Sequence, residues 1–509
     1  MQMVSQQTFD FIVIGSGATG SVVANRLSAD PGTKVLVLEA GELDTNPNIQ
    51  DIGGFVKLWG SSVDWQFATE DQPGMAGRQI AINQGKVLGG STSLNAMMYV
   101  RGNPGNFDRW SKLGATGWDY DGVLPYFKSL EDYEGGASAY HGTGGALSIR
   151  DCPDAVMRSE EFLVGATQVG YDGPHWDYNG ERQENGAGLL QFHIDKQGHR
   201  VSGATAFLAP IKGRSNLTIE TGAEVTRLVL DKTKVVGVEY RQNGQTHQVN
   251  AVREVILSAG ALQSPKLLML SGIGPGEHLQ EHGIPVVVDL PGVGQNLQDH
   301  LQLPIVFRTK TERPNTTLLT GNVLFVNTRT DQPDAPPDLQ LNFTPSVPEP
   351  LAPILNFGVP VCIFLGILVQ PKSVGEIRLR SSDPQAAPVI DPRYLSDPAD
   401  VKTLAAGVEL ARTIAQAPAF APLNAGEIVP GEADIEAFIR SQASTLWHPA
   451  GTCKIGQDSM AVVDPQLRVH GVEGLRVADA SVMPTVTSGN TVATCFMIGE
   501  KLADLILSA

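Results

Sequence analysis

The fold of this chain is decided by one stretch near its start, Phe9-Asp10-Phe11-Ile12-Val13-Ile14-Gly15-Ser16-Gly17-Ala18-Thr19-Gly20. Its first six residues are mostly apolar and predict a strand that is covered on both faces of a parallel sheet. The pattern G-x-G-x-x-G follows directly and predicts a tight turn that opens a helix. A turn at Pro31-Gly32 and an apolar run at residues 34–39 then predict a second strand. These elements together predict a βαβ unit of the Rossmann type.

The glycines and the end of the second strand indicate a dinucleotide site. Gly15 permits the tight turn, Gly17 lets backbone N–H groups approach a pyrophosphate, and Gly20 lets the helix pack closely on the strand. Glu39 ends the second strand, where a carboxylate accepts the ribose hydroxyls and repels a 2′-phosphate. NADP is therefore disfavoured, while NAD and FAD both remain open. The same site is expected to include Ala18, Thr19 and Ala40.

Composition limits the classes of function. The chain has 509 residues, of which 42% are apolar and 18% charged, so it can bury large cores as an enzyme does. Its net charge of −17 argues against nucleic acid and anionic membrane surfaces as partners. The four cysteines are scattered and form no C-x-x-C pair, so neither a metal site nor a disulfide framework is expected.

Two further patterns concern location. Residues 1–8 are polar and run directly into the first strand, so we expect no signal peptide. The longest apolar run, residues 359–369, contains Pro360 and Gly366 and is shorter than the roughly 18 residues of a membrane helix. We read this run as a buried strand, and we expect a cytoplasmic protein with no membrane span.

The rest of the chain predicts a mixture of elements. Residues 218–240 alternate as antiparallel strands do, and residues 331–353 are rich in proline and predict a long loop or an irregular crossing between elements. Helical spacing occurs at residues 260–270, 398–414, 432–441 and 491–507, and a last strand is expected at residues 475–479.

The strand–turn–helix at the end of the chain repeats the arrangement at its start. We therefore predict an α/β fold with a Rossmann-type cofactor domain that is discontinuous in sequence. That domain comprises residues 1–155, 205–300 and 464–509. The inserted substrate domain, built on an antiparallel sheet, comprises residues 156–204 and 301–463.

Four long segments resemble the motifs of the glucose–methanol–choline (GMC) oxidoreductases. They resemble the family in order as well as in sequence, from residue 9 to about residue 507, most weakly between residues 301 and 353. The segments are Gly85-Lys86-Val87-Leu88-Gly89-Gly90-Ser91-Thr92-Ser93-Leu94-Asn95, then Gly260-Ala261-Leu262-Gln263-Ser264-Pro265 continuing to Gly274, then Trp447-His448-Pro449-Ala450-Gly451-Thr452-Cys453, and finally Val477-Ala478-Asp479-Ala480-Ser481 with Gly489-Asn490-Thr491.

The resemblance implies FAD as the cofactor and assigns residues to it. The segment that borders the isoalloxazine would contribute Val87, Gly90, Asn95, Ala96 and Met97. The remaining contacts would come from Val225 beside adenine, from Asp479 and Ala480 near the ribityl and pyrophosphate groups, and from Asn490, Thr491 and Val492 at the start of the last helix. Members with covalent FAD carry a linking histidine just before the Asn95 position, where this chain has Leu94. Non-covalent FAD is therefore expected.

Catalysis is expected to centre on His448 and Asn490. Most of the ten histidines, including His141, His278 and His300, read as structural or solvent-facing. His448 differs because it matches the family's catalytic motif, and an imidazole can take the proton of an alcohol while hydride passes to flavin N5. Asn490 would hold the substrate oxygen, as in the His–Asn branch of the family, which includes choline oxidases and hydroxymethylfurfural oxidases.

The predicted function is oxidation of an alcohol to an aldehyde or ketone, with oxygen or a quinone-like compound reoxidising the flavin. Two non-redox or light-driven relatives remain as alternatives: a hydroxynitrile lyase and, less favoured, a fatty-acid photodecarboxylase. A serine hydrolase is disfavoured because the chain has no G-x-S-x-G motif. The sequence favours a neutral primary or aromatic alcohol but does not identify it, nor the acceptor, nor the oligomeric state.

Overall fold

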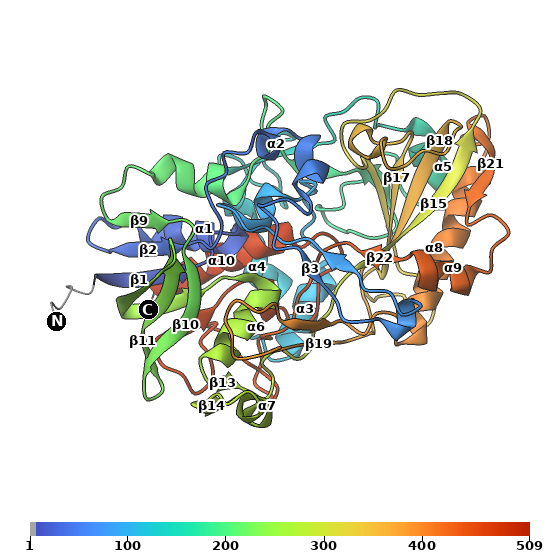
Figure 1. The fold of residues 1–509 in the computed structure, drawn as a ribbon. Helices are drawn as coiled ribbons and strands as arrows, with labels where there is room; N and C mark the ends of the chain where they lie inside the picture. The colour runs from blue at the N-terminus through green and yellow to red at the C-terminus, as the bar shows by residue number, and fades with distance from the viewer. Residues whose placement is uncertain (1–6, 509) are drawn as a thin grey trace.

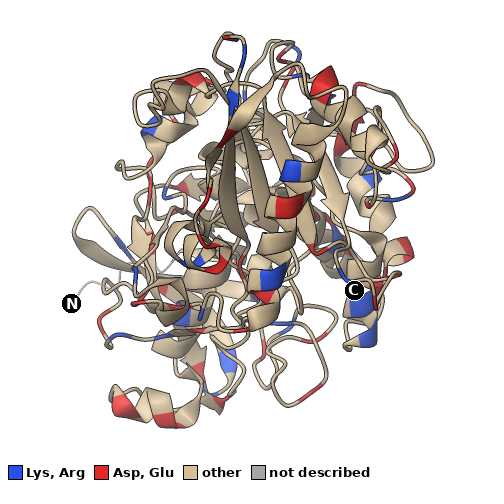
Figure 2. Cartoon of the chain, turned by 90° about the vertical axis from the view of Figure 1, so that its right-hand side faces the viewer, with Lys and Arg blue, Asp and Glu red and all other residues tan. Residues whose placement is uncertain are grey.

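The computed structural model describes residues 7–508. Two large sheets lie at opposite ends of the molecule, with helices and irregular segments between and around them (Figure 1). The expectation of no signal peptide concerns residues that lie largely outside this range. Acidic and basic residues, coloured on the cartoon in Figure 2, are interspersed along the chain.

The first sheet is a Rossmann-type sheet with an antiparallel extension. Its order is β10-β11-β12-β1-β2-β9, and β23 pairs with β12. The parallel strands are β1 (Thr8–Ile14), β2 (Val35–Leu38), β9 (Leu217–Glu220), β12 (Gln245–Leu257) and β23 (Leu475–Val477). The antiparallel pair is β10 (Glu224–Asp231) and β11 (Lys234–Gln242). Every residue of β2 and the last four of β1 are buried, as their apolar sequences predict.

The C-terminal helix packs on the first helix and so joins the two ends of the chain. α1 (Ala18–Leu27) and α10 (Val492–Leu507) approach so closely that a Cβ on Gly499 would lie 2.8 Å from the carbonyl oxygen of Thr19. The Thr19 hydroxyl donates to the Cys495 carbonyl at 2.8 Å. This packing places the start of α10 beside the glycine-rich turn.

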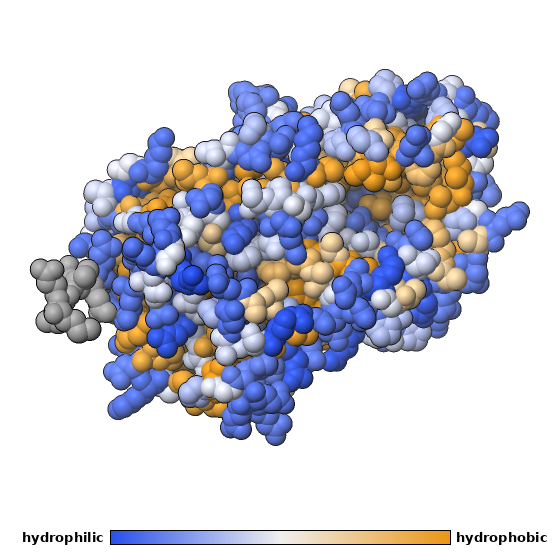
Figure 3. Space-filling view, in the orientation of Figure 1, coloured by the Kyte–Doolittle hydropathy of each residue, from blue (hydrophilic) through white to orange (hydrophobic). Residues whose placement is uncertain are grey.

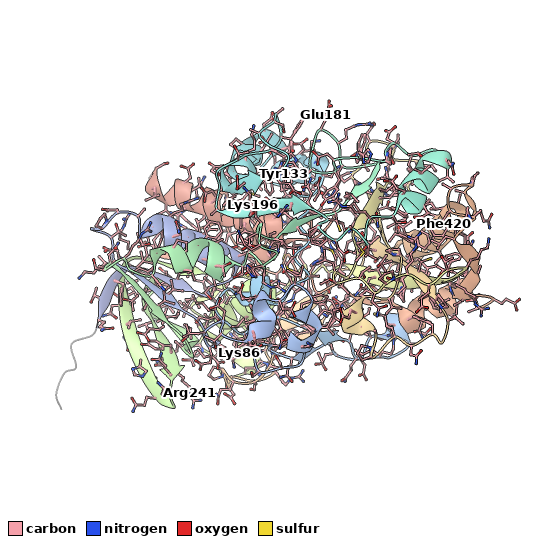
Figure 4. All side chains as sticks on the ribbon, turned by 90° about the horizontal axis from the view of Figure 1, so that it is seen from above. Lys86, Tyr133, Glu181, Lys196, Arg241 and Phe420 are labelled. Atoms are coloured by element: carbon pink, nitrogen blue, oxygen red, sulfur yellow. The ribbon has the colours of Figure 1, made fainter. Side chains whose placement is uncertain are left out.

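The second sheet is antiparallel and has the order β21-β15-β18-β17-β16-β7, with β22 paired to β15. Its strands are β7 (Ala187–Leu189), β15 (Leu301–Thr309), β16 (Asn322–Val326), β17 (Leu339–Thr344), β18 (Val361–Leu368), β21 (Asn424–Val429) and β22 (Ser444–Thr445). It packs against α5 (Glu160–Gln168), α8 (Pro398–Gln416) and α9 (Ile435–Gln442). Phe420, labelled in Figure 4, lies 5.4 Å from Phe343 and 5.5 Å from Phe364 between ring centroids in this core.

Shorter elements connect and cover the two sheets. The helices are α2 (Pro47–Gln50), α3 (Pro104–Lys112), α4 (Tyr120–Leu130), α6 (Gly260–Leu270) and α7 (Gly276–Glu281). The small strands are β3 (Phe67–Ala68), β4 (Ala81–Ile82), β5 (Glu131–Tyr133), β6 (Leu147–Asp151), β8 (Gln191–His193), β13 (Ile273–Gly274), β14 (Val288–Asp289), β19 (Glu376–Arg378) and β20 (Val389–Asp391).

Most predicted elements are confirmed, including the predicted helix at 260–270 and the buried strand within residues 359–369. Two interpretations are wrong. Residues 331–353 are not all irregular, because they contain β17. This strand pairs with β16 and β18, and all six of its residues are buried. The prolines on both sides of β17 led us to interpret the whole segment as irregular. The antiparallel prediction for residues 218–240 fails at residues 218–220, because β9 pairs parallel with β2 at the sheet edge, and it holds for β10 and β11.

Candidate functional site

The turn between β1 and α1 shows why its three glycines are needed. A Cβ on Gly15, whose φ is +94°, would lie 2.4 Å from the Ser258 carbonyl oxygen, and one on Gly20 would lie 2.0 Å from the Gly15 carbonyl oxygen. Gly17 differs, because nothing lies within 4 Å of its Cβ position and the residue borders the main cavity. The turn therefore leaves open space at a helix N-terminus, where an anionic pyrophosphate is stabilised.

Glu39 is buried directly after β2 and is fixed by three donors. Its carboxylate accepts from the Ser16 N–H at 3.0 Å, the Ser16 hydroxyl at 2.7 Å and the Gly41 N–H at 2.8 Å. Burial raises the pKa of Glu39, and these donors oppose the rise. A carboxylate has about four lone-pair sites. At least one site remains for a ribose hydroxyl.

A large cavity runs from this turn to the C-terminal part of the chain. Sixteen of the predicted cofactor residues line it: Gly15, Gly17, Ala18, Thr19, Glu39, Ala40, Gly90, Asn95, Ala96, Met97, Val225, Asp479, Ala480, Asn490, Thr491 and Val492. The other two do not border it. Gly20 packs against the turn, and the Val87 side chain is buried with Leu58, Val63 and Leu94. Val87 is thus placed behind the cavity wall.

A strained segment forms one wall of the cavity. Met97 has a φ of +62°, which an ordinary side chain rarely adopts. The Asn95 side-chain oxygen stabilises this conformation by accepting from the Met97 N–H at 3.1 Å and from Arg200 Nη1 at 2.6 Å. Burial lowers the pKa of Arg200 to about 9. The sequence did not single out Arg200, which has no recognisable motif around it.

The start of α10 is open to the cavity. Asp479, which also lines the cavity, accepts from the Gly260 N–H at 2.8 Å, the Ser264 hydroxyl at 2.6 Å and the Ser481 N–H at 2.8 Å. Thr491, the residue before the helix, makes no side-chain capping bond, and Val492 borders the cavity. The first N–H groups of α10 are thus available to negative charge.

His448 and Asn490 meet at the same cavity. The Asn490 amide nitrogen lies 3.3 Å from Nε2 of His448, and the Asn490 side-chain oxygen is buried with no partner among the described residues. Because an amide nitrogen only donates, Nε2 accepts and carries no proton. The neutral His448 ring therefore carries its proton on Nδ1, which lies 3.0 Å from Nδ1 of His300.

His300 is a site residue that the sequence interpretation missed. We expected it to be structural or solvent-facing, and the structure buries it completely against the His448 ring. His300 contacts Nδ1 of His448, whereas Asn490 contacts Nε2, and all three residues are far apart in sequence. A signal was present in the Asp299-His300 pair directly before an apolar strand, but no local pattern linked that pair to His448.

Asp299 anchors both histidines. Its buried carboxylate accepts from the backbone N–H of His300 at 2.9 Å and of His448 at 2.8 Å, and from the hydroxyls of Tyr394 and Thr445. The Thr445 hydroxyl oxygen in turn accepts from the Trp447 N–H at 2.7 Å. Trp447 has a φ of +61°, so this network stabilises a strained residue immediately before His448.

Burial sets the protonation of this cluster. It lowers the pKa of His448 well below its usual value, with the neighbouring His300 adding to the effect, and it lowers the pKa of His300 to about 3. Burial also raises the pKa of Asp299 to about 6, against the four hydrogen bonds that it accepts. Both histidines are thus neutral at pH 7, and Nε2 of His448 is available to accept a proton.

The family description "GMC oxidoreductase" matches residues 9–302 and 371–499. The chain belongs to the GMC oxidoreductase family. An uncharacterized GMC-type oxidoreductase of Mycobacterium tuberculosis is 43% identical, with 98% of this chain and 99% of the relative covered. Human mitochondrial choline dehydrogenase is 40% identical, with 99% and 90% covered. Pyridoxine 4-oxidase from Mesorbium loti is 33% identical with a TM-score of 0.90, covering 98% of this chain and 99% of that one.

This GMC oxidoreductase is an FAD-dependent enzyme. The cavity fits FAD on three observations: the open space at Gly17, the remaining acceptor site on Glu39 and the uncapped start of α10. Within residues 7–508, no helix of this GMC oxidoreductase has both the length and the apolar character required to cross a bilayer.

Glu39→Gln should weaken FAD binding by about 10- to 100-fold, since a charge-assisted hydrogen bond contributes roughly 1.5–3 kcal/mol. The new amide group would also face the N–H groups of Ser16 and Gly41. Titration of the FAD-free protein with FAD, followed by flavin fluorescence, measures the dissociation constant. Glu42→Gln makes the same charge change at an exposed neighbour and should have little effect. Equal affinities of the two variants would contradict the ribose role.

Proposed function

We propose that this protein oxidises an alcohol to an aldehyde or ketone, with His448 as the general base and Asn490 positioning the substrate oxygen. The observation that carries the proposal is the pairing of an unprotonated Nε2 of His448 with the Asn490 amide, 3.3 Å apart, at the cavity. Bound FAD supplies the two-electron acceptor, since the alcohol carbon loses a hydride as the hydroxyl loses a proton. Oxygen or a quinone-like compound then removes the electrons.

His448 is suited to accept the hydroxyl proton. A neutral imidazole that is positioned beside a reacting hydroxyl accelerates the reaction by accepting its proton. The bond from Nδ1 to His300 fixes the tautomer that leaves Nε2 unprotonated, and the Asp299 bond to the His448 backbone fixes the ring's attachment point. When the proton arrives, the ring becomes positively charged in a buried setting. Bound FAD would supply a compensating negative charge once it has accepted the electrons.

Asn490 is suited to hold the alcohol oxygen. It cannot accept a proton as a base, but its amide N–H groups donate hydrogen bonds. Its side-chain oxygen is buried without a partner, a cost that a native site tolerates where a ligand completes the bonding. A hydroxyl placed between the amide and Nε2 is therefore oriented toward the base.

We further propose that the chain is divided as the sequence suggests, into a cofactor domain of residues 1–155, 205–300 and 464–509 and a substrate domain of residues 156–204 and 301–463. In support, the strands of the first sheet all fall within the first set of ranges and those of the second sheet within the second. His448 comes from the second set and Asn490 from the first. The reacting groups would thus meet across the domain boundary.

The cofactor is proposed to be bound without a covalent link. Leu94 occupies the position of the linking residue, and its side chain is buried among Ile49, Leu58, Val63 and Val87. Acid denaturation followed by centrifugation should release yellow FAD into the supernatant, where mass spectrometry identifies it. Flavin that stays in the pellet would contradict the non-covalent assignment, and FMN would contradict the dinucleotide assignment.

Anaerobic mixing with alcohols tests the redox function itself. The absorbance of oxidised flavin should bleach on addition of a substrate alcohol and recover when oxygen or a quinone is admitted. A hydroxynitrile lyase or a photodecarboxylase, the alternatives open from sequence, would leave the flavin oxidised in the dark. No bleaching by any alcohol would reject the proposed oxidation.

A further inference from the structure

The side chains that line the cavity near His448 are uncharged, and most of them are apolar. The cavity lining includes Leu446, Trp447 and Pro449, which flank His448 in sequence, and Trp59, which contacts Trp447, as well as Met97, Met98 and Leu319. Two neutral polar side chains of the lining also reach this part, Asn490 beside His448 and Gln84 beside the Trp447 carbonyl. The rings of Trp59 and Trp447 lie 4.7 Å apart between centroids, tilted by 46°. They contact each other and form one continuous apolar wall. Figure 3 shows apolar surface in the hollow where the part carrying β15 and β18 meets the rest of the molecule.

The ionisable side chains of the cavity belong to its nucleotide end. Among the described residues that line it, the acidic and basic side chains other than the neutral His448 are Glu39, Glu224, Lys266 and Asp479. Glu39 is bonded to the glycine-rich turn, and Asp479 to the start of α6. Lys266, on α6, donates to the Pro384 carbonyl at 2.7 Å, and Glu224 begins β10. None of these charges belongs to the wall around His448.

Asp299, which accepts from the His448 backbone N–H, adds no charge to the cavity wall. Asp299 does not line the cavity, is 4% exposed and lies behind the His448 backbone. It already accepts hydrogen bonds from four donors. Its charge is therefore directed into the protein and leaves no free acceptor for a ligand.

From this separation of charges we infer that the substrate is an uncharged alcohol with an apolar, preferably flat, group next to the hydroxyl-bearing carbon. This inference rests on the proposed alcohol oxidation and specifies its substrate class. A cation enclosed by the wall would lose its hydration without gaining a carboxylate, and an anion would gain neither Arg nor Lys. Contact with an aromatic face attracts a cation. Because Trp59 and Trp447 contact each other, however, they leave no gap in which a cation is enclosed from two sides. The other two lining rings, Trp65 and Phe67, stack on each other, and Lys86 already lies over Trp65.

A pair of isosteric alcohols tests the inference on the FAD-loaded enzyme. Choline and 3,3-dimethylbutan-1-ol have nearly the same shape and differ by one positive charge. We expect anaerobic flavin reduction to give a ratio of reduction rate to dissociation constant that favours the neutral alcohol by at least about tenfold. Benzyl alcohol should be as good or better, and the anion glycolate should be poor. An equal or greater value for choline, or for glycolate, would overturn the inference while leaving the alcohol oxidation intact.

Two variants at one wall position separate charge from polarity. Leu319→Glu places a carboxylate in the wall, and Leu319→Gln places a neutral side chain of the same size there. The ratio of choline to 3,3-dimethylbutan-1-ol should rise by about tenfold in the first variant relative to the second. Equal ratios in two folded, FAD-containing variants would show that wall charge does not set specificity, against the inference. If no alcohol reduced the flavin of the unsubstituted enzyme, that result would instead contradict the proposed function.

Discussion

Flavin reduction by alcohol should slow by about 10²–10⁴-fold in His448→Ala, the usual contribution of a positioned acid–base group. The variant should still bind FAD, because the glycine-rich turn, Glu39 and the start of α10 are unchanged. Stopped-flow absorbance under anaerobic conditions measures the rate, and flavin content per protein measures retention of the cofactor. Reduction at the parent rate would remove His448 from catalysis.

Asn490→Ala is the matched comparison, because it removes the partner of Nε2 but keeps the base. Its loss should be smaller than that of His448→Ala, since only the placement of the substrate oxygen is affected. An equal or larger loss would show that orientation by Asn490, and not proton transfer to His448, dominates the rate.

The pH dependence distinguishes two roles for the histidine. Burial holds the pKa of His448 well below its usual range, so the base is already neutral at pH 7. The parent's reduction rate should therefore be constant from neutral pH upward and fall only in acid, as Nε2 takes up a proton. If instead a protonated imidazole stabilised the alkoxide, the rate would fall as pH rises. That opposite sign would reject His448 as the general base.

Asp299→Asn should slow flavin reduction by about 10- to 100-fold, because a misplacement of about 1 Å in a reacting group costs up to that order. The amide oxygen can still face the N–H groups of His300 and His448. Its nitrogen would then face the hydroxyls of Tyr394 and Thr445, which now donate to the carboxylate. Thr445 would have to turn, and its bond to the strained Trp447 would be disturbed.

The pH dependence of the reduction rate distinguishes a positioning role of Asp299 from a general loss of stability. The pKa of Asp299 is raised to about 6, so the parent should lose reduction rate as pH falls through about 6 and the carboxylate gains a proton. Asp299→Asn should lack this step and keep the FAD affinity of the parent. Asp400→Asn, at another buried carboxylate that does not line the cavity and accepts from the Ser373 N–H, controls for the general cost of the substitution. Similar rates in the two variants would assign Asp299 to structure alone.

The sequence by itself determined the features that depend on local contacts. The turn at Gly15, Gly17 and Gly20 could be assigned because close approach to neighbouring carbonyls and to an anion excludes a side chain. The strands β1 and β2 and the helix α6 followed from apolar periodicity, which reports burial over a few residues. The family motifs then identified FAD and pointed to His448 and Asn490.

Only the tertiary structure decided what depends on contacts between distant segments. The hydrogen bond from His448 to His300, the four donors around Asp299 and the buried Arg200 beside Asn95 each join residues that no local pattern relates. The burial of β17 likewise depends on its two neighbours and not on its proline-rich flanks. The charge of the cavity also depends on tertiary structure, because side chains from several distant segments line it. Here the charged lining side chains Glu39, Glu224, Lys266 and Asp479 come from other segments than His448, whose own neighbours His300 and Asn490 are neutral.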